Sequence, residues 1–96
     1  MTFELKIDVD ALAFIKRLPG KSQTIIDGKI KTLKGNPFPG RRGDKELLDL
    51  KEGKKIYRIH ISHRYTAFYR ISKDKKIVYI TDVMTIEQAH KKYGLL

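Results

Sequence analysis

The chain has 96 residues, of which 41% are hydrophobic, and its 21 Lys and Arg outnumber 11 Asp and Glu to give a formal net charge of +10. A second core would need roughly fifty more residues, so we expect a single domain over residues 1–96, and this hydrophobic content excludes a disordered chain. The positive charge indicates a partner that is either a phosphate polyanion or an acidic protein.

The cell compartment is indicated by what the sequence lacks. There is no cysteine, which excludes disulfides and thiolate metal sites and fits a reducing environment. No apolar run approaches the ~20 residues that span a bilayer, and the start MTFELKI lacks the basic and apolar regions of a secretory signal. We therefore expect a cytoplasmic protein.

The first predicted elements are a strand and a helix. In TFELKID, residues 2–8, apolar and polar side chains alternate, which is typical of a strand with one buried face. Apolar residues then follow a helical spacing over residues 11–18, and Asp8 or Asp10 can cap this helix. Pro19-Gly20 ends it.

A second helix is predicted between Ser22, as its N-cap, and the breaker Gly35-Asn36-Pro37. Gly28 lies inside this helix at a cost of up to about 1 kcal/mol relative to alanine. Close packing against the first helix is one explanation for this glycine. The stretch NPFPGRRGDKE, residues 36–46, reads as a loop, and LLDLKEGKK, residues 47–55, is ambiguous between a short strand and irregular chain.

The second half of the chain predicts an antiparallel meander. Three β-rich runs cover residues 56–62, 65–71 and 77–84 and are joined by short turns. Thr85 and Gln88 have the spacing of a capping box, which opens a short C-terminal helix that Gly94 would close. The order β-α-α-β-β-β-α indicates an α+β fold in which the two N-terminal helices pack on one face of a mainly antiparallel sheet and leave the other face open.

The run YRIHI places basic side chains on that open face. Because side chains alternate along a strand, the set Tyr57, Ile59 and Ile61 faces the helices and the set Arg58, His60 and Ser62 faces away. Arg58 and His60 are then about 7 Å apart, near a turn that adds His63 and Arg64.

Basic and aromatic residues are mixed throughout this region. Between Lys51 and Lys76 the chain has nine basic residues and two acidic ones. Cations interleaved with aromatic rings suit a phosphate backbone and unstacked bases, and a solvated basic sheet face is the alternative. The residues that we expect to bind RNA are Lys54, Lys55, His63, Tyr65 and Arg70.

The three histidines are the candidates for acid–base chemistry, since imidazole exchanges protons near neutral pH. Cleavage of RNA by its 2′-hydroxyl needs a base, a cation on the phosphorane and a proton for the leaving 5′-oxygen. Arg58 and Arg64 fit the cation role because a guanidinium binds phosphate oxygens in a two-pronged geometry. Each histidine taken singly is better explained as a surface or structural residue, and only their clustering favours a catalytic role. On a strand His60 and His63 point to opposite faces, so we expect no metal and no cofactor.

Nearly the whole chain resembles the RelE/ParE toxin superfamily. The similar segments are AFIKRLP, a second helix ending in LKGNP, YRIHI, the pair Tyr65 and Tyr69, and KIVYITDV before the tail. The resemblance implies a RelE-like fold and a toxin of a type II toxin-antitoxin system that cleaves mRNA on the ribosome. It also implies a hetero-oligomer with a small acidic antitoxin.

The resemblance also implies a set of catalytic residues. Arg58 and His60 stand where the family has paired basic residues, and Arg64 would replace an arginine that is missing because Thr66 follows Tyr65. The family's late arginine is missing as well, since Thr85-Ile86-Glu87 stands there. His90 and Tyr93 would substitute from the tail. Two alternatives stay open, namely a ParE-like toxin that binds DNA gyrase without cleaving RNA and a plain nucleic-acid-binding module.

Overall fold

The computed structural model describes residues 2–41, 43–49 and 55–93. Its elements in chain order are β1 (Glu4–Ile7), α1 (Val9–Lys16), α2 (Gly20–Lys31), the 3₁₀ turn η1 (Thr32–Lys34), β2 (Lys45–Asp49), β3 (Lys55–Ile61), β4 (Tyr65–Ser72), β5 (Ile77–Thr85) and α3 (Ile86–Tyr93). In this described part of the chain, no helix combines the length and the apolar character needed to cross a bilayer. Gly94, the expected end of the last helix, lies outside the described residues.

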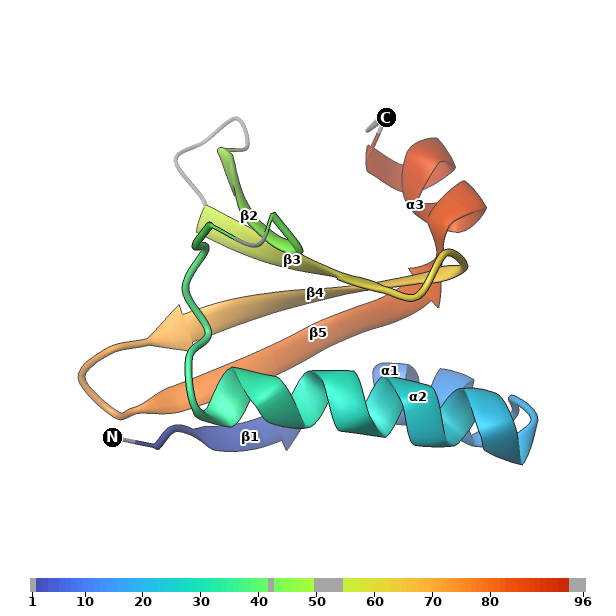
Figure 1. Ribbon diagram of the computed structural model, residues 1–96, viewed down its shortest axis with the longest axis horizontal. Helices are drawn as coiled ribbons and strands as arrows, with labels where there is room; N and C mark the ends of the chain where they lie inside the picture. The colour runs from blue at the N-terminus through green and yellow to red at the C-terminus, as the bar shows by residue number, and fades with distance from the viewer. Residues whose placement is uncertain (1, 42, 50–54, 94–96) are drawn as a thin grey trace.

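The five strands form one sheet in the order β1-β5-β4-β3-β2. β1 is parallel to β5, and the other neighbouring pairs are antiparallel, so the α+β class and the mainly antiparallel sheet are confirmed. Figure 1 shows α1 and α2 together beside β1, and α3 apart from them where β5 ends. The predicted element order was incomplete, because β2 forms in the segment that was read partly as loop and partly as ambiguous. Lys45 to Asp49 find their partners in β3, which no local pattern reveals.

The N-terminal helices confirm one predicted cap and contradict another. Asp8 caps α1 by accepting a hydrogen bond from the Asp10 backbone N–H at 3.2 Å. Ser22 does not cap α2, which begins directly after the extended residue Pro19 and has no side-chain cap. Gln23 joins the helices instead, since its side-chain amide donates to the Leu18 carbonyl at 2.8 Å.

Gly28 is not required by close packing. A Cβ atom placed on this residue would meet nothing within 4 Å, so the explanation offered from the sequence is wrong. The fully buried residues Ile26 and Ile30 mark the side of α2 that faces the core.

The main core lies between the sheet and these helices. Ile59 and Ile61 of β3 are fully buried in it, with Tyr57 packed against them, which confirms the predicted orientation of this strand. Tyr69 is also buried, and its hydroxyl donates to the Pro37 carbonyl at 2.7 Å, which fixes the loop after η1. Burial raises the pKa of Tyr69, so the phenol stays protonated.

The other face of the sheet carries a second, smaller core of Leu48, Phe68, Met84 and Ala89, with Ile56 packed against it. α3 lies against β4 and β5, and Ala89 is its buried residue. Its predicted capping box is confirmed, because the Gln88 N–H donates to Thr85 Oγ1 at 3.1 Å and the Thr85 N–H donates to Gln88 Oε1 at 3.0 Å. The expectation that this face is open is therefore wrong for the part under α3, since Phe68 and Met84 need an apolar cover.

Candidate functional site

Three charged or titratable side chains meet on adjacent strands. β2 and β3 pair with Glu46 opposite Arg58, and His60 follows two residues later on the same side of β3. Glu46 Oε1 forms an ion pair with Arg58 Nη2 and lies 3.8 Å from His60 Nε2. We call these three residues the β2–β3 cluster.

Arg58 is buried more deeply than the sequence suggested. It is 7% exposed and lies on the sheet face of the second core, opposite to α1 and α2. Its Nε is buried and has no hydrogen-bond partner among the described residues, and burial lowers the pKa of its guanidinium. Because the unpaired Nε is buried, an incoming anion would bind this guanidinium by displacing Glu46 from Nη2.

His60 is half-exposed, with 42% of its side chain accessible. Burial, and then the positive charge of Arg58, lower the pKa of this imidazole below its ordinary value of 6.5, and Asp44 acts in the opposite direction. The neutral imidazole therefore dominates at pH 7. A neutral, accessible imidazole beside a cation can accept a proton from a substrate hydroxyl.

Asp44, directly before β2, contacts both β3 and α2. Its backbone carbonyl accepts a hydrogen bond from the His60 N–H at 2.9 Å, and its side chain contacts Lys29 of α2, with 2.9 Å between Oδ2 and Nζ. The hydrogen bond from Lys29 lowers the pKa of the Asp44 carboxyl below 3.8, although burial opposes it. The residues before β2 are thus tied to both α2 and β3.

Arg64 and His63 lie in the exposed turn between β3 and β4. Ser62 opens this turn with φ of 53°, and its hydroxyl accepts a hydrogen bond from the Arg64 N–H at 3.3 Å. The Arg64 carbonyl accepts from the Ile86 N–H at 2.9 Å, which places the turn beside the start of α3. Both side chains line a groove of about 540 Å³ between the turn and α3.

The remaining predicted site residues are distributed more widely. His90 is exposed on α3, but no contact joins it to the β2–β3 cluster in the described part of the structure. Tyr93 is the last residue of α3 and its side chain lies outside the described residues, as does Lys54. Lys55 and Arg70 are exposed.

Tyr65 has to be withdrawn from the predicted RNA-binding residues. It is only 8% exposed, and its ring packs edge-on against Phe14 of α1 with centroids 6.3 Å apart. The alternation along β4 points Tyr65 toward the helices, as it does Tyr69. Its ring is therefore part of the main core, although the residue also borders the groove that His63 and Arg64 line.

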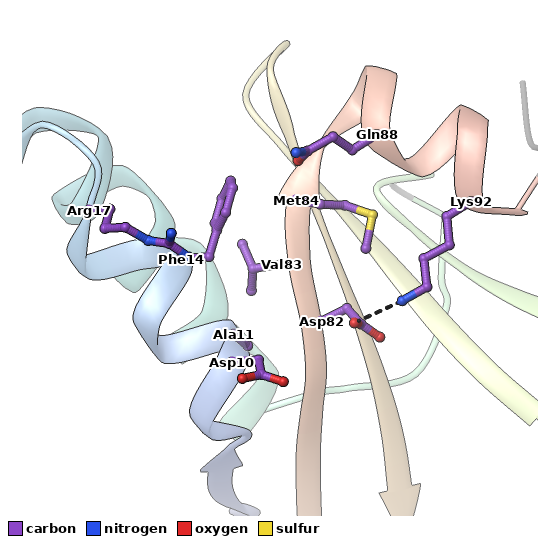
Figure 2. A pocket seen from close by; sticks show the side chains of 9 residues that line it. All are labelled: Asp10, Ala11, Phe14, Arg17, Asp82, Val83, Met84, Gln88 and Lys92. Atoms are coloured by element: carbon purple, nitrogen blue, oxygen red, sulfur yellow. Dashed lines mark hydrogen bonds and ion pairs between the residues drawn. The ribbon is translucent and has the colours of Figure 1, made fainter.

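A separate groove of about 320 Å³ lies between α1, β5 and α3 (Figure 2). Ala11, Phe14, Val83 and Met84 give it an apolar lining, and Lys92 reaches across to Asp82 with 3.4 Å between Nζ and Oδ1. None of the predicted site residues lines this groove. It is thus distinct from the β2–β3 cluster.

No group of three or more His, Cys, Asp or Glu side chains in the described residues is arranged to hold a metal ion. Glu46 is the one cluster member that the sequence did not single out. It stands at the end of NPFPGRRGDKE, where no period-two pattern marks a strand, and its closeness to Arg58 follows only from the pairing of β2 with β3.

Solved structures with a similar fold include RelE toxins and a YoeB/ParE toxin. The archaeal RelE–RelB complex from Pyrococcus horikoshii OT3 matches with a TM-score of 0.73 and 20% identity over 88% of this chain and 96% of that one. The toxin-antitoxin complex RelBE2 from Mycobacterium tuberculosis gives 0.70 and 17% over 88% and 99%. The YoeB/ParE toxin from Agrobacterium tumefaciens gives 0.69 and 19% over 86% and 98%. At these identities the likeness shows the fold, which is RelE-like.

The sequence itself identifies the family. The model of the ParE toxin of the type II toxin-antitoxin system parDE matches residues 5–89, so the chain belongs to this family. It is a type II toxin of the RelE/ParE superfamily, as the resemblance predicted. A search of curated protein sequences finds no match to this chain.

Proposed function

We propose that this toxin is an endoribonuclease that cleaves ribosome-bound mRNA and so inhibits translation. The observation that carries the proposal is the β2–β3 cluster, which combines a half-exposed neutral imidazole with a neighbouring guanidinium whose carboxylate partner, Glu46, is itself accessible. Proton transfer to and from a substrate hydroxyl uses such an imidazole beside a cation. The net charge of +10 favours an RNA substrate.

The proposed reaction is attack of an RNA 2′-hydroxyl on the adjacent phosphorus. His60 accepts the proton of that hydroxyl, the new P–O bond forms a 2′,3′-cyclic phosphate, and the bond to the 5′-oxygen breaks. Arg58 stabilises the negative charge of the phosphorane through the Nη2 donor that now binds Glu46, which the phosphate displaces. Arg64, from the neighbouring turn, adds a second guanidinium.

The leaving 5′-oxygen needs a proton, which we assign to His90 or Tyr93 of the C-terminal segment. Substrate binding would have to bring this segment toward the cluster. Lys54, Lys55, His63 and Arg70 remain the proposed contacts to the RNA backbone, with Tyr65 removed from that set because it is buried.

The test is the variant His60→Gln, which keeps a polar side chain and removes the titrating imidazole. Purified variant should leave mRNA on ribosomes intact, whereas wild-type protein cuts it at defined positions that primer extension maps. Lys75→Gln, in the exposed turn after β4, is the control for a surface substitution and should cut like wild type. Cleavage and growth arrest by a folded His60→Gln protein at the wild-type level would refute the proposed role.

The second candidate is inhibition of DNA gyrase, and the family match favours it because it is to a ParE model. The carboxylate of Glu46 also neutralises the Arg58 guanidinium, which would otherwise be available to bind a substrate phosphate. Purified protein would then block supercoiling of plasmid DNA by gyrase while transcripts keep their length. The ribonuclease proposal expects that supercoiling by gyrase continues and that transcripts are shortened.

We further propose that a small acidic antitoxin binds and neutralises the protein. The structures of RelE–RelB and RelBE2 contain a toxin with its antitoxin, and the charge of +10 suits an acidic partner. Expression of the toxin gene together with its immediate genomic neighbour should restore growth and give a complex that copurifies. Continued arrest with a stably expressed neighbour would exclude that neighbour as the antitoxin.

A further inference from the structure

A second group of cationic and aromatic side chains lies on the sheet face that carries the β2–β3 cluster. Tyr79 of β5 is the residue opposite Arg70 of β4 on one side and opposite Lys6 of β1 on the other. The flanking residues Val78 and Ile80 are buried in the main core, so Tyr79 points away from α1 and α2. An aromatic ring thus stands between two cations, in a row across three strands.

The three side chains are accessible. Arg70 and Lys6 are exposed and Tyr79 is half-buried. Arg70 and Tyr79 line a groove of about 450 Å³ with Ile71, Ser72 and Thr81. Neighbours directly opposite on paired strands have Cβ atoms roughly 5 Å apart, so a ligand that stacks on the ring is within reach of both cations.

This row is close to the β2–β3 cluster. Arg58 of β3 is opposite Phe68 of β4, and Arg70 lies two residues farther along β4 on the same side. Such diagonal neighbours are about 7–8 Å apart, with no intervening strand. The acidic group nearest along β5, Asp82, is paired with Lys92 and lies beyond the β-bulge at Phe68 and Tyr69.

We infer that Tyr79, Arg70 and Lys6 form a nucleotide subsite for single-stranded RNA, in which an unpaired base stacks on the Tyr79 ring and its flanking phosphates bind Arg70 and Lys6. An aromatic ring flanked by cations is the chemistry that binds unstacked nucleotides with little base preference. That the nucleotide belongs to the strand cleaved at the β2–β3 cluster rests on the proposed ribonuclease function. The subsite then holds the RNA a few nucleotides from the cleaved phosphate, since His60 is opposite Thr66 and Arg70 lies four residues farther along β4, roughly 13 Å away.

The test measures binding separately from cleavage. The probe is a fluorescent ten-nucleotide RNA with 2′-O-methyl groups, which cannot be cleaved because its 2′-hydroxyls are blocked, and binding is followed by anisotropy at several salt concentrations. Tyr79→Ala should weaken binding about 5- to 100-fold, the range expected for loss of one stacked base, whereas Tyr79→Phe should bind like wild type. Arg70→Gln should lower the slope of log K against log salt by about 0.7, the value for one phosphate contact on a single strand.

The control is Arg17→Gln, which removes the same charge from the exposed end of α1 and should leave the salt slope unchanged. Equal affinity of Tyr79→Ala and wild type, or equal slopes of Arg70→Gln and Arg17→Gln, would overturn the subsite. If wild-type protein cuts ribosome-bound mRNA but the Tyr79 and Arg70 variants bind the probe as well as wild type does, the subsite proposal is wrong and the ribonuclease proposal stands. Protein that binds the probe through Tyr79 but cuts no mRNA would overturn the ribonuclease proposal alone.

Discussion

The Arg58 guanidinium depends on a single carboxylate. It is 7% exposed, its partner Glu46 keeps 44% of its side chain accessible, and its Nε is buried without a partner in the described structure. Removing the carboxylate leaves a buried positive charge without an anion, which is costly because the charge has lost its water.

We therefore expect Glu46→Ala to lower the free energy of unfolding by about 1.5–3 kcal/mol, the range for a hydrogen bond to a charged group. Urea denaturation followed by circular dichroism measures this change. Asp27→Ala, an exposed carboxylate on α2, is the matched control and should have little effect. Equal losses in the two variants would mean that the ion pair contributes nothing.

His60 should make stability depend on pH. The pKa of His60 in the folded protein lies below its ordinary value of 6.5, so the unfolded chain binds a proton more readily. Stability that is fully present above pH 6.5 is then lost as the pH falls through 6.5 toward the folded pKa. The unfolding free energy of wild type should drop more between about pH 7.5 and pH 5.5 than that of His60→Gln, in urea titrations at both pH values. Parallel drops in the two proteins would contradict this assignment.

Among the elements, α2 shows how one helix combines a core face and a solvent face. Ile26 is fully buried against the sheet and the adjacent Ile25 is 46% exposed. The two residues have the same chemistry and the same helical propensity, so they differ only in burial.

Ile26→Ala should destabilise the protein by about 2–5 kcal/mol because it leaves a cavity in a close-packed core. Ile25→Ala should cost well under half as much, since its side chain is already partly in water. Thermal and urea unfolding of the pair measure the difference directly. Similar losses for both variants would show that α2 does not pack as described.

At the scale of the whole molecule, the net charge of +10 governs encounters with other macromolecules. A field of one sign attracts any polyanion and is screened by salt. The affinity for a short RNA should therefore fall steeply between 50 and 200 mM salt, by roughly tenfold or more if several phosphates are contacted. A peptide nucleic acid of the same base sequence, which has no phosphates, should bind weakly at every salt concentration in the same anisotropy assay. Salt-independent RNA binding would show that the charge is not what attracts the strand.

Much of the architecture could be predicted from local patterns. The alternation in β1 and β3, the caps at Asp8 and Thr85 and the meander each depend on interactions within a few residues or between consecutive strands. Strand β2 was missed because it forms only by pairing with β3. The cap at Ser22 was wrong because α2 already begins directly after Pro19.

The candidate site divides in the same way. That Arg58 and His60 share a strand face follows from the sequence alone, because side chains alternate along any strand. The assembled sheet is needed to show that Glu46 binds Arg58, that Tyr65 is buried beneath α1, and that Tyr79 stands between Arg70 and Lys6. The Tyr65–Phe14 and Tyr79–Lys6 contacts join elements far apart in the chain, and the Glu46–Arg58 and Tyr79–Arg70 pairs join consecutive strands. In each case the register is set by the packing of the whole sheet, which a local pattern does not encode.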